Sequence, residues 1–314
     1  MKSVLADTAL KIKSMEIRGA GKIAREAASA LKSHAESLDT QNSGNFLSEM
    51  RTAGDILLKT RPTAVSLPNA VNIILSGMDG SDDAGEIRAG IVRRADSFIE
   101  RSNSAVRRIG EIGARRISDG DVVLTHCNSQ VAIGCILEAH RQGKDIEVFA
   151  TEVRPRNQGL LTIKSLSDAG IKTSFIVDSA ARYFMKDVDI VVIGTDAVTV
   201  NGSVVNKIGT SQIALAAHEA RTRVMVAAET YKFAPKTLTG ELIQIEERDS
   251  SEVLSPEIAA AMPNVTVRNP AFDITPAEYI DLIVTEEGAI PPEMAYIIIK
   301  DYLGWKIRDF DNER

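Results

Sequence analysis

Cysteine and histidine are scarce in this 314-residue sequence, which has two cysteines and four histidines. Two cysteines cannot form a disulfide framework, and they indicate reduced thiols in a cytoplasmic protein. The histidines lack the spacing that zinc ligands need, so the sequence predicts neither a metal site nor another cofactor; they are His34, His126, His140 and His218.

An excess of basic residues and long hydrophobic runs are also missing. The formal net charge is -6, whereas binding to nucleic-acid phosphates needs a basic surface, so no nucleic-acid partner is expected. No segment is long and apolar enough to span a bilayer, and the opening MKSVLADTALKIK has no apolar signal-peptide core. The proportions of 44% hydrophobic and 25% charged residues are typical of a globular protein without membrane segments.

The first third of the chain carries helical patterns. Ala24–Leu38 is rich in alanine and lysine, and Ala84–Ile117 has apolar residues at roughly helical spacing. We therefore predict a helical N-terminal domain over residues 1–117 and a second domain over residues 118–314.

The second domain alternates short apolar runs with helix-length segments. Nearly continuous apolar strands that alternate with helices are typical of a parallel sheet buried on both faces. The pattern predicts an α/β fold with a Rossmann-like, doubly wound parallel sheet, and a closing helix from Pro292. Its expected strands are Asp121–Thr125, Ile146–Thr151, Thr173–Val177, Asp189–Thr195, Arg223–Ala227 and Asp281–Thr285.

Two residues that could carry chemistry follow expected strands. Ligands of open α/β sheets bind beyond the carboxyl ends of the strands. Cys127 follows the first strand and precedes a helix whose dipole would favour the thiolate; the alternative is a small buried apolar residue. Asp196 follows the fourth strand, where it could serve as a general acid or simply occupy a turn. The Asn201-Gly202 pair after it suits a type I′ hairpin turn.

Two turns rich in basic residues and glycine could bind anions. Residues 206–211 (NKIGTS) lead into a helix, and exposed amides at a helix start can bind phosphate. Residues 18–22 (RGAGK) precede a long helix in the first domain, and Arg61-Pro62 ends another. Ordinary helix starts and loops would explain the same residues. Two such turns would suit a substrate with two phosphates.

Five motifs in order, THCNSQ, EVRPRNQG, GTDAV, NGSVVNKIGT and YKFAP, extend a resemblance over nearly the whole chain. They resemble the superfamily that joins methylthioribose-1-phosphate isomerases, ribose-1,5-bisphosphate isomerases and the regulatory subunits of the translation-initiation guanine exchange factor. RGAGKIAR at Arg18–Arg25 and RPTAVSLPNA at Arg61–Ala70 are similar to archaeal ribose-1,5-bisphosphate isomerases in particular. The resemblance implies a helical N-terminal domain followed by a Rossmann-like domain.

The resemblance also implies roles for individual residues. Cys127 and Asp196 match the catalytic pair, which the exchange-factor subunits typically lack. The motifs imply substrate binding by Arg18, Gly19, Ala20, Gly21, Arg61, Asn128, Ser129, Gln130, Arg154, Asn206, Lys207 and Lys232.

The expected activity is conversion of ribose 1,5-bisphosphate to ribulose 1,5-bisphosphate in nucleoside-monophosphate (AMP) degradation. Asp196 would protonate the ring oxygen and Cys127 would remove the proton on C2, unless the hydrogen moves as hydride. The alternatives are a methylthioribose-1-phosphate isomerase and a non-enzymatic regulatory subunit. The resemblance also implies the partners: a small sugar bisphosphate and further copies of the chain, in a homo-oligomer built from dimers, such as a hexamer.

Overall fold

The structure is a computed structural model that describes residues 4–240 and 242–303. Its contacts divide the chain into two compact units. We call residues up to Ala105 together with Tyr231–Phe233 the helical unit, and residues 106–230 together with those from Ala234 onward the sheet unit. The predicted fold class, a helical region followed by a mostly parallel sheet, is confirmed.

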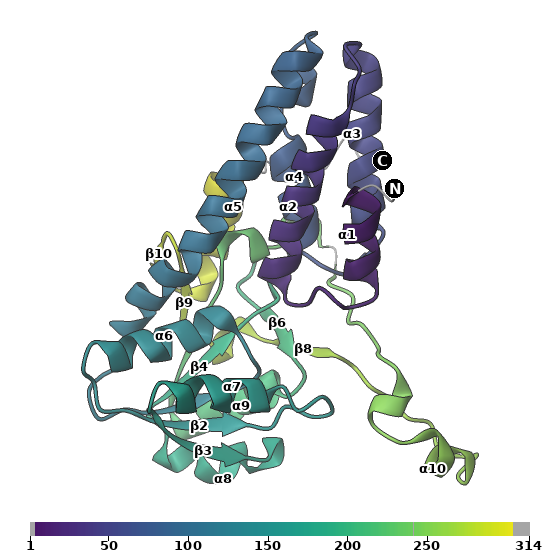
Figure 1. The fold of residues 1–314 in the computed structure, drawn as a ribbon. Coiled ribbons are helices and arrows are strands. Elements are labelled where there is room, and N and C mark those ends of the chain that lie inside the picture. Colours follow the sequence, from purple (N-terminus) through teal and green to yellow (C-terminus); the bar gives the residue numbers. More distant parts are fainter. Residues whose placement is uncertain (1–3, 241, 304–314) are drawn as a thin grey trace. The chain divides into compact units, whose positions relative to one another are not determined.

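The described part of the helical unit contains the α-helices α1 (Val4–Lys13), α2 (Ala20–Ser37), α3 (Ser43–Leu58), α4 (Ser66–Leu75) and the first part of α5 (Ala84–Ala114) (Figure 1). The helices expected over residues 24–38 and 84–117 are thus confirmed. α2 buries Ile23, Ala27 and Leu31 along one face, a spacing of four residues that gives one helical stripe. Because α5 contributes residues to both units, the domain boundary at residue 117 stays a prediction.

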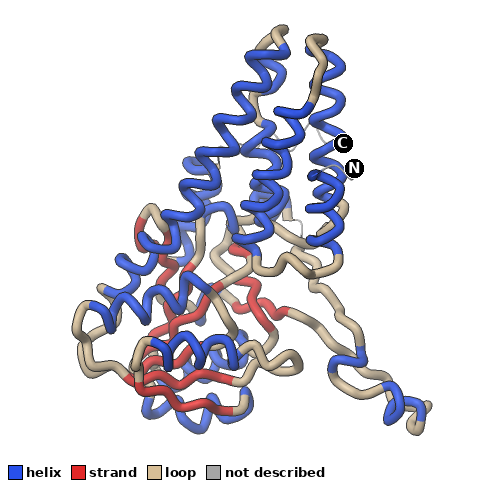
Figure 2. Tube along the Cα trace, in the orientation of Figure 1, coloured by secondary structure: helices blue, strands red, loops and turns tan. Residues whose placement is uncertain are grey.

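A seven-stranded sheet forms the sheet unit, in the order β10-β9-β7-β4-β1-β2-β3 (Figure 2, red). All six expected strands are present, with ends that differ by at most one residue, and all six are parallel; β10, an antiparallel edge strand, was not predicted. The strands are β1 (Val122–Thr125), β2 (Glu147–Thr151), β3 (Lys172–Ile176), β4 (Ile190–Gly194), β7 (Arg223–Ala227), β9 (Leu282–Thr285) and β10 (Gly288–Ile290).

Helices pack on the sheet in two pairs. α6 (Gln130–Arg141) lies beside α7 (Gly159–Asp168), and α8 (Ala181–Phe184) lies beside α9 (Thr210–Ala220). Because crossovers between parallel strands are right-handed, the two pairs lie on opposite faces: the chain runs one way along the sheet from β1 to β3 and the opposite way from β3 through β4 to β7. Every residue of β4 is therefore buried. The chain between β7 and β8 (Phe272–Thr275) includes α10 (Pro256–Ala260), and the expected closing helix runs through α11 (Ala295–Ile297).

After β4 the chain enters a small second sheet, whose strand order is β5-β6-β8. Its strands are β5 (Ala197–Val198), β6 (Val204–Lys207) and β8 (Phe272–Thr275). The predicted hairpin is present, but the type I′ turn is wrong: Thr199 N–H donates to the Ser203 carbonyl at 2.9 Å, which leaves a three-residue turn. Of the turn residues only Gly202 has a positive φ, 81°, whereas type I′ needs two.

Among the described residues, no helix combines the length and the hydrophobicity that crossing a bilayer requires.

Candidate functional site

The site lies at the point where the sheet reverses its winding. β1 and β4 are neighbours, and the chain continues from β1 to β2 on one side and from β4 to β7 on the other. Cys127 follows β1 and Asp196 follows β4. Open α/β sheets bind ligands at such a switch point, so the fold brings together the two residues that the sequence singled out.

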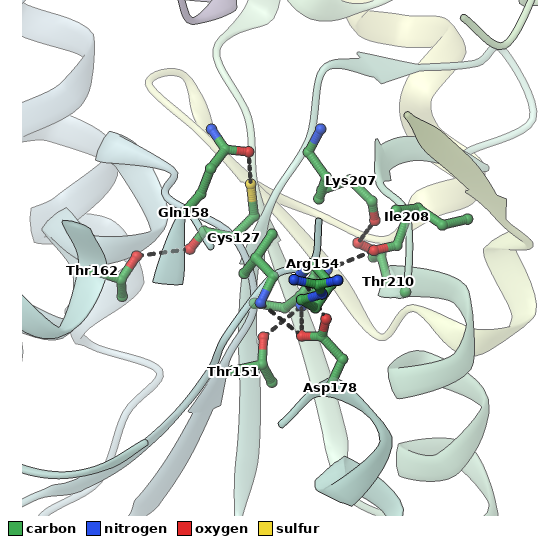
Figure 3. Close-up of polar contacts among 12 residues, drawn as sticks. Cys127, Thr151, Arg154, Gln158, Thr162, Asp178, Lys207, Ile208 and Thr210 are labelled. Atoms are coloured by element: carbon green, nitrogen blue, oxygen red, sulfur yellow. Dashed lines mark hydrogen bonds and ion pairs between the residues drawn. The ribbon is translucent and has the colours of Figure 1, made fainter. Parts of the chain in front are cut away.

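Cys127 lies in a loop with an unusual backbone conformation. Its φ is 70°, which is uncommon for a residue with a side chain. Its carbonyl accepts a hydrogen bond from the Thr162 hydroxyl at 2.9 Å, and its thiol lies 3.9 Å from the Gln158 side-chain oxygen (Figure 3). These contacts from α7 and the turn before it hold the sulfur in place.

His126, whose role the sequence did not reveal, holds this loop from the other side. Its Nε2 donates to the Ile208 carbonyl at 3.0 Å, because a carbonyl can only accept, and its Nδ1 then accepts from the Thr151 hydroxyl at 2.6 Å. Burial lowers the pKa of His126 despite the Asp178 carboxylate 3.7 Å away, so the ring is neutral. This neutral ring links β1 to β2 and to the loop before α9.

The charges of Asp196 and Lys207 both act on the Cys127 thiol. Burial raises the pKa of the Cys127 thiol to about 11; the charge of Lys207 lowers it and that of Asp196 raises it further. The thiolate expected from a helix dipole is therefore wrong for the free protein. α6 begins only at Gln130, with Ser129 as its N-cap, so Cys127 lies outside the first turn and burial dominates.

The cysteine's protonation gives a direct test in the intact protein. With a pKa of about 11, on the order of one thiol in a thousand is ionised at pH 8, so alkylation of Cys127 should accelerate about tenfold per pH unit up to pH 10. Because the charge of Lys207 lowers this pKa, Lys207→Met should raise it, and alkylation should then be slower at every pH below the pKa of the thiol. Mass spectrometry of the Cys127 peptide measures the rate, and Lys164→Met, an exposed residue of α7, is the control. A plateau near pH 8 in the wild-type protein would contradict the assignment.

The anion site predicted at residues 206–211 is filled by the protein itself. The Asp273 carboxylate accepts hydrogen bonds from Gly209 N–H at 2.8 Å and from Ser211 N–H at 3.2 Å. These are the amides that a phosphate would have taken at the start of α9, so this part of the prediction is wrong. Burial raises the pKa of Asp273 to about 6. The β8 strand supplies the carboxylate from more than sixty residues away, beyond the reach of local sequence patterns.

The remaining predicted residues of the sheet unit have mixed surroundings. The Asn128 side-chain oxygen accepts from Thr162, and the Asn206 side-chain amide donates to Thr210 at 3.0 Å. Ser129 caps α6 through its hydroxyl, and Gln130 is exposed. Lys207 is buried with its ammonium 4.7 Å from the centre of the Phe272 ring. Figure 3 shows Lys207 and Gln158 extending to the same side as the Cys127 sulfur.

The backbone of Arg154 is held in place by Asp178. The Asp178 carboxylate accepts hydrogen bonds from the N–H groups of Val153 at 2.9 Å and Arg154 at 2.8 Å. The Arg154–Pro155 bond is cis, and both residues line a pocket that also includes Gln158 and Lys207. The pocket therefore adjoins the Cys127 contacts.

The predicted binding residues of the helical unit also converge. Arg18 Nε donates to the Met15 carbonyl at 2.5 Å, and the Arg61 guanidinium lies 2.7 Å from the Met15 sulfur. Gly19, with a φ of 86°, permits the sharp turn into α2, which begins at Ala20 and Gly21. The Ser66 hydroxyl donates to the Ala20 carbonyl at 3.3 Å, which joins this turn to α4.

Lys232 reaches the same helix. The Asn69 side chain on α4 donates to the carbonyls of Tyr231 at 2.9 Å and Phe233 at 2.7 Å, and Lys232 between them is buried. The first turns of α4 thus anchor both the RGAG turn and the Lys232 segment. In the described residues no three His, Cys, Asp or Glu side chains come together as a metal site would require.

Comparison with known proteins places the chain in a family. The family model described as Initiation factor 2 subunit family (IF-2B) matches residues 16–292, well over half of the chain. The chain belongs to the initiation factor 2 subunit family. The resemblance that its five motifs indicated is confirmed.

Several known proteins are similar to this chain over almost their full length. The ribose 1,5-bisphosphate isomerase of Methanocaldococcus jannaschii is 55% identical over 302 residues, which cover 96% of each chain. Two structures from Pyrococcus horikoshii OT3 are each 32% identical. Translation initiation factor eIF-2B has a TM-score of 0.79 over 93% of this chain and 98% of its own. 5-Methylthioribose 1-phosphate isomerase has a TM-score of 0.76 over 97% and 88%.

Proposed function

We propose that this member of the initiation factor 2 subunit family is an isomerase that converts ribose 1,5-bisphosphate to ribulose 1,5-bisphosphate. The placement of Cys127, Asp196 and Lys207 around one switch point carries the proposal. It is supported by the name of the relative that is 55% identical over nearly the whole chain. In this proposal the reaction is a step of nucleoside-monophosphate degradation, and the enzyme is a cytoplasmic homo-oligomer.

The proposed reaction begins with ring opening. A sugar that carries phosphate on its anomeric oxygen has no anomeric hydroxyl to lose a proton, so the bond from C1 to the ring oxygen must break directly. Asp196 donates a proton to that ring oxygen as the bond breaks. A carboxyl group positioned in this way contributes on the order of 10²–10⁴-fold to the rate.

The second step moves hydrogen between two carbons. Cys127 first loses its thiol proton to solvent. The thiolate then takes the proton from C2 to give an enol that keeps its phosphate, and the thiol returns that proton to C1 while the C2 hydroxyl proton passes to Asp196. Lys207 supports this role because its charge opposes the effect of burial on the thiol. A hydride shift from C2 to C1 is the competing route, in which Cys127 would only contact the C2 hydroxyl. Solvent deuterium at C1 after reaction in deuterated water would exclude the hydride route.

We also propose substrate-binding residues in each unit. In the sheet unit they are Asn128, Ser129, Gln130, Arg154, Asn206 and Lys207, and in the helical unit they are Arg18, Gly19, Ala20, Gly21, Arg61 and Lys232. The convergence of Arg18 and Arg61 on Met15 supports a basic site of defined geometry in the helical unit.

A comparison of two substrates tests the proposal. The purified protein is expected to turn over ribose 1,5-bisphosphate and to use methylthioribose 1-phosphate poorly, because the thioether lacks the second phosphate. Cys127→Ser is the matched negative control, since it exposes any contaminating isomerase. The reverse preference would favour the 5-methylthioribose 1-phosphate isomerase to which the fold is similar. If neither sugar reacts, a non-enzymatic subunit like the similar initiation factor becomes the better explanation.

A further inference from the structure

The pocket beside Cys127 is more basic than the sequence motifs indicate. Its lining includes Arg154, Arg156, Lys207 and Arg248, and among the described residues that line it Glu252 alone is acidic. Glu252 forms an ion pair with Arg156. Outside the lining, Glu246 pairs with Arg248, so the four cations face two carboxylates. The remaining excess of positive charge suits a dianion such as a phosphate monoester.

Arg248 is held in a defined place in this pocket. Its side chain is only 12% exposed, and its Nε lies 3.4 Å from a carboxylate oxygen of Glu246. The centre of its guanidinium lies 5.7 Å from the centre of the Phe272 ring, the same ring that lies beneath the Lys207 ammonium. A single aromatic ring therefore orients both cations, and a guanidinium fixed in this way can donate two parallel hydrogen bonds to phosphate oxygens.

Arg248 and Lys207 are close enough to interact with each other and with the catalytic cysteine. Burial lowers the pKa of Lys207, and the charge of Arg248 lowers it further. Both cations lower the pKa of Cys127. A dianion between the two cations would remove their mutual repulsion and would lie next to the reacting carbon atoms.

We propose that Arg248, together with Lys207, binds a phosphate of the substrate in the pocket beside Cys127. This inference rests on the proposed function, in which the substrate carries two phosphates. Arg248 is then a binding residue that discriminates sugar bisphosphates from sugars with an uncharged group at one end.

Kinetics of Arg248→Gln test the proposal. Removing a charged hydrogen-bond donor from a phosphate should raise KM for ribose 1,5-bisphosphate by about 10- to 100-fold, with a smaller change in kcat. Arg248→Lys keeps the charge but not the paired donors, so its KM should lie between that of the wild type and that of Arg248→Gln. Arg268→Gln is the matched control: Arg268 belongs to the same segment and pairs with Glu247, but it is exposed and outside the pocket. Equal KM values for Arg248→Gln and Arg268→Gln would overturn the proposal.

A second measurement does not depend on turnover. Inorganic phosphate should slow alkylation of Cys127 in the wild-type protein and in Arg268→Gln, and the concentration for half protection should rise at least tenfold in Arg248→Gln. If ribose 1,5-bisphosphate is not a substrate but phosphate protects in this pattern, the phosphate site stands and the proposed function fails. If Arg248→Gln does not fold, Arg248→Lys carries the test, and unchanged protection in it would overturn the phosphate site.

Discussion

Asp196→Asn is expected to lower kcat/KM for ribose 1,5-bisphosphate by about 10²–10⁴-fold, because an amide cannot protonate the ring oxygen. The loss should appear mainly in kcat, since a general acid acts on the transition state. Folding should be kept: the backbone N–H of Asp196 donates to the Val205 carbonyl at 2.9 Å, and that bond does not involve the side chain. Steady-state kinetics with melting temperatures measured in parallel provide the test.

Asp187→Asn is the matched control for this loss. Asp187 is exposed and precedes β4, whereas Asp196 follows it, so the two carboxylates lie at opposite ends of one strand. The control variant should retain wild-type activity. If Asp196→Asn loses less than about threefold while Asp187→Asn is unaffected, ring opening does not depend on this carboxyl group, and the assigned acid is wrong.

Gly194→Ala is expected to damage both stability and activity. A Cβ atom at Gly194 would lie 2.1 Å from the Ser129 Oγ and 2.4 Å from the Ser129 Cβ, so the start of α6 would have to move away from β4. Overpacking of this kind costs about 1–3 kcal/mol of unfolding free energy. Asp196 follows Gly194 by two residues and Cys127 precedes Ser129 by two, so kcat/KM should fall as well. Urea unfolding and kinetics on the same preparation measure the two effects.

Gly134→Ala, within α6, serves as the control. A Cβ atom there would meet only ordinary contacts, the nearest being the Val106 carbonyl oxygen at 3.7 Å, and alanine is the better helix former. This variant should be as stable as the wild type or slightly more stable. Equal stability of Gly194→Ala would show that β4 and the N-cap of α6 are not in close contact.

The hairpin after β4 shows where local sequence patterns stop. Asn201-Gly202 correctly indicated a turn between two strands, because these residues favour turns wherever they occur. The turn type depends on which residues pair across the hairpin, and the pairing of Val198 with Val204 left room for three turn residues instead of two. Pairing is a tertiary property, so the dipeptide could not decide it.

The basic, glycine-bearing stretch at residues 206–211 shows the same limit for function. The motif correctly predicted the start of α9, which begins at Thr210. It could not show that Asp273 occupies the amides, because β8 pairs with β6 only once the small sheet has formed. Arg248 was missed for a related reason. It lies outside any regular strand or helix, and long-range contacts bring it to the pocket: its backbone N–H donates to the Asn269 carbonyl at 2.9 Å, and its side chain packs on Phe272.

The sequence by itself determined the order of the six parallel strands along the chain and the positions of Cys127 and Asp196 at the ends of two of them. Strand ends can be found from the sequence because alternation of apolar runs with helical segments is a local pattern. Its five ordered motifs also determined the family. Only the tertiary structure decided that β1 and β4 are neighbours, that His126 is neutral, and that Cys127 is a half-buried thiol with a pKa of about 11. Burial and charge depend on residues far away in the chain, and no local pattern carries that information.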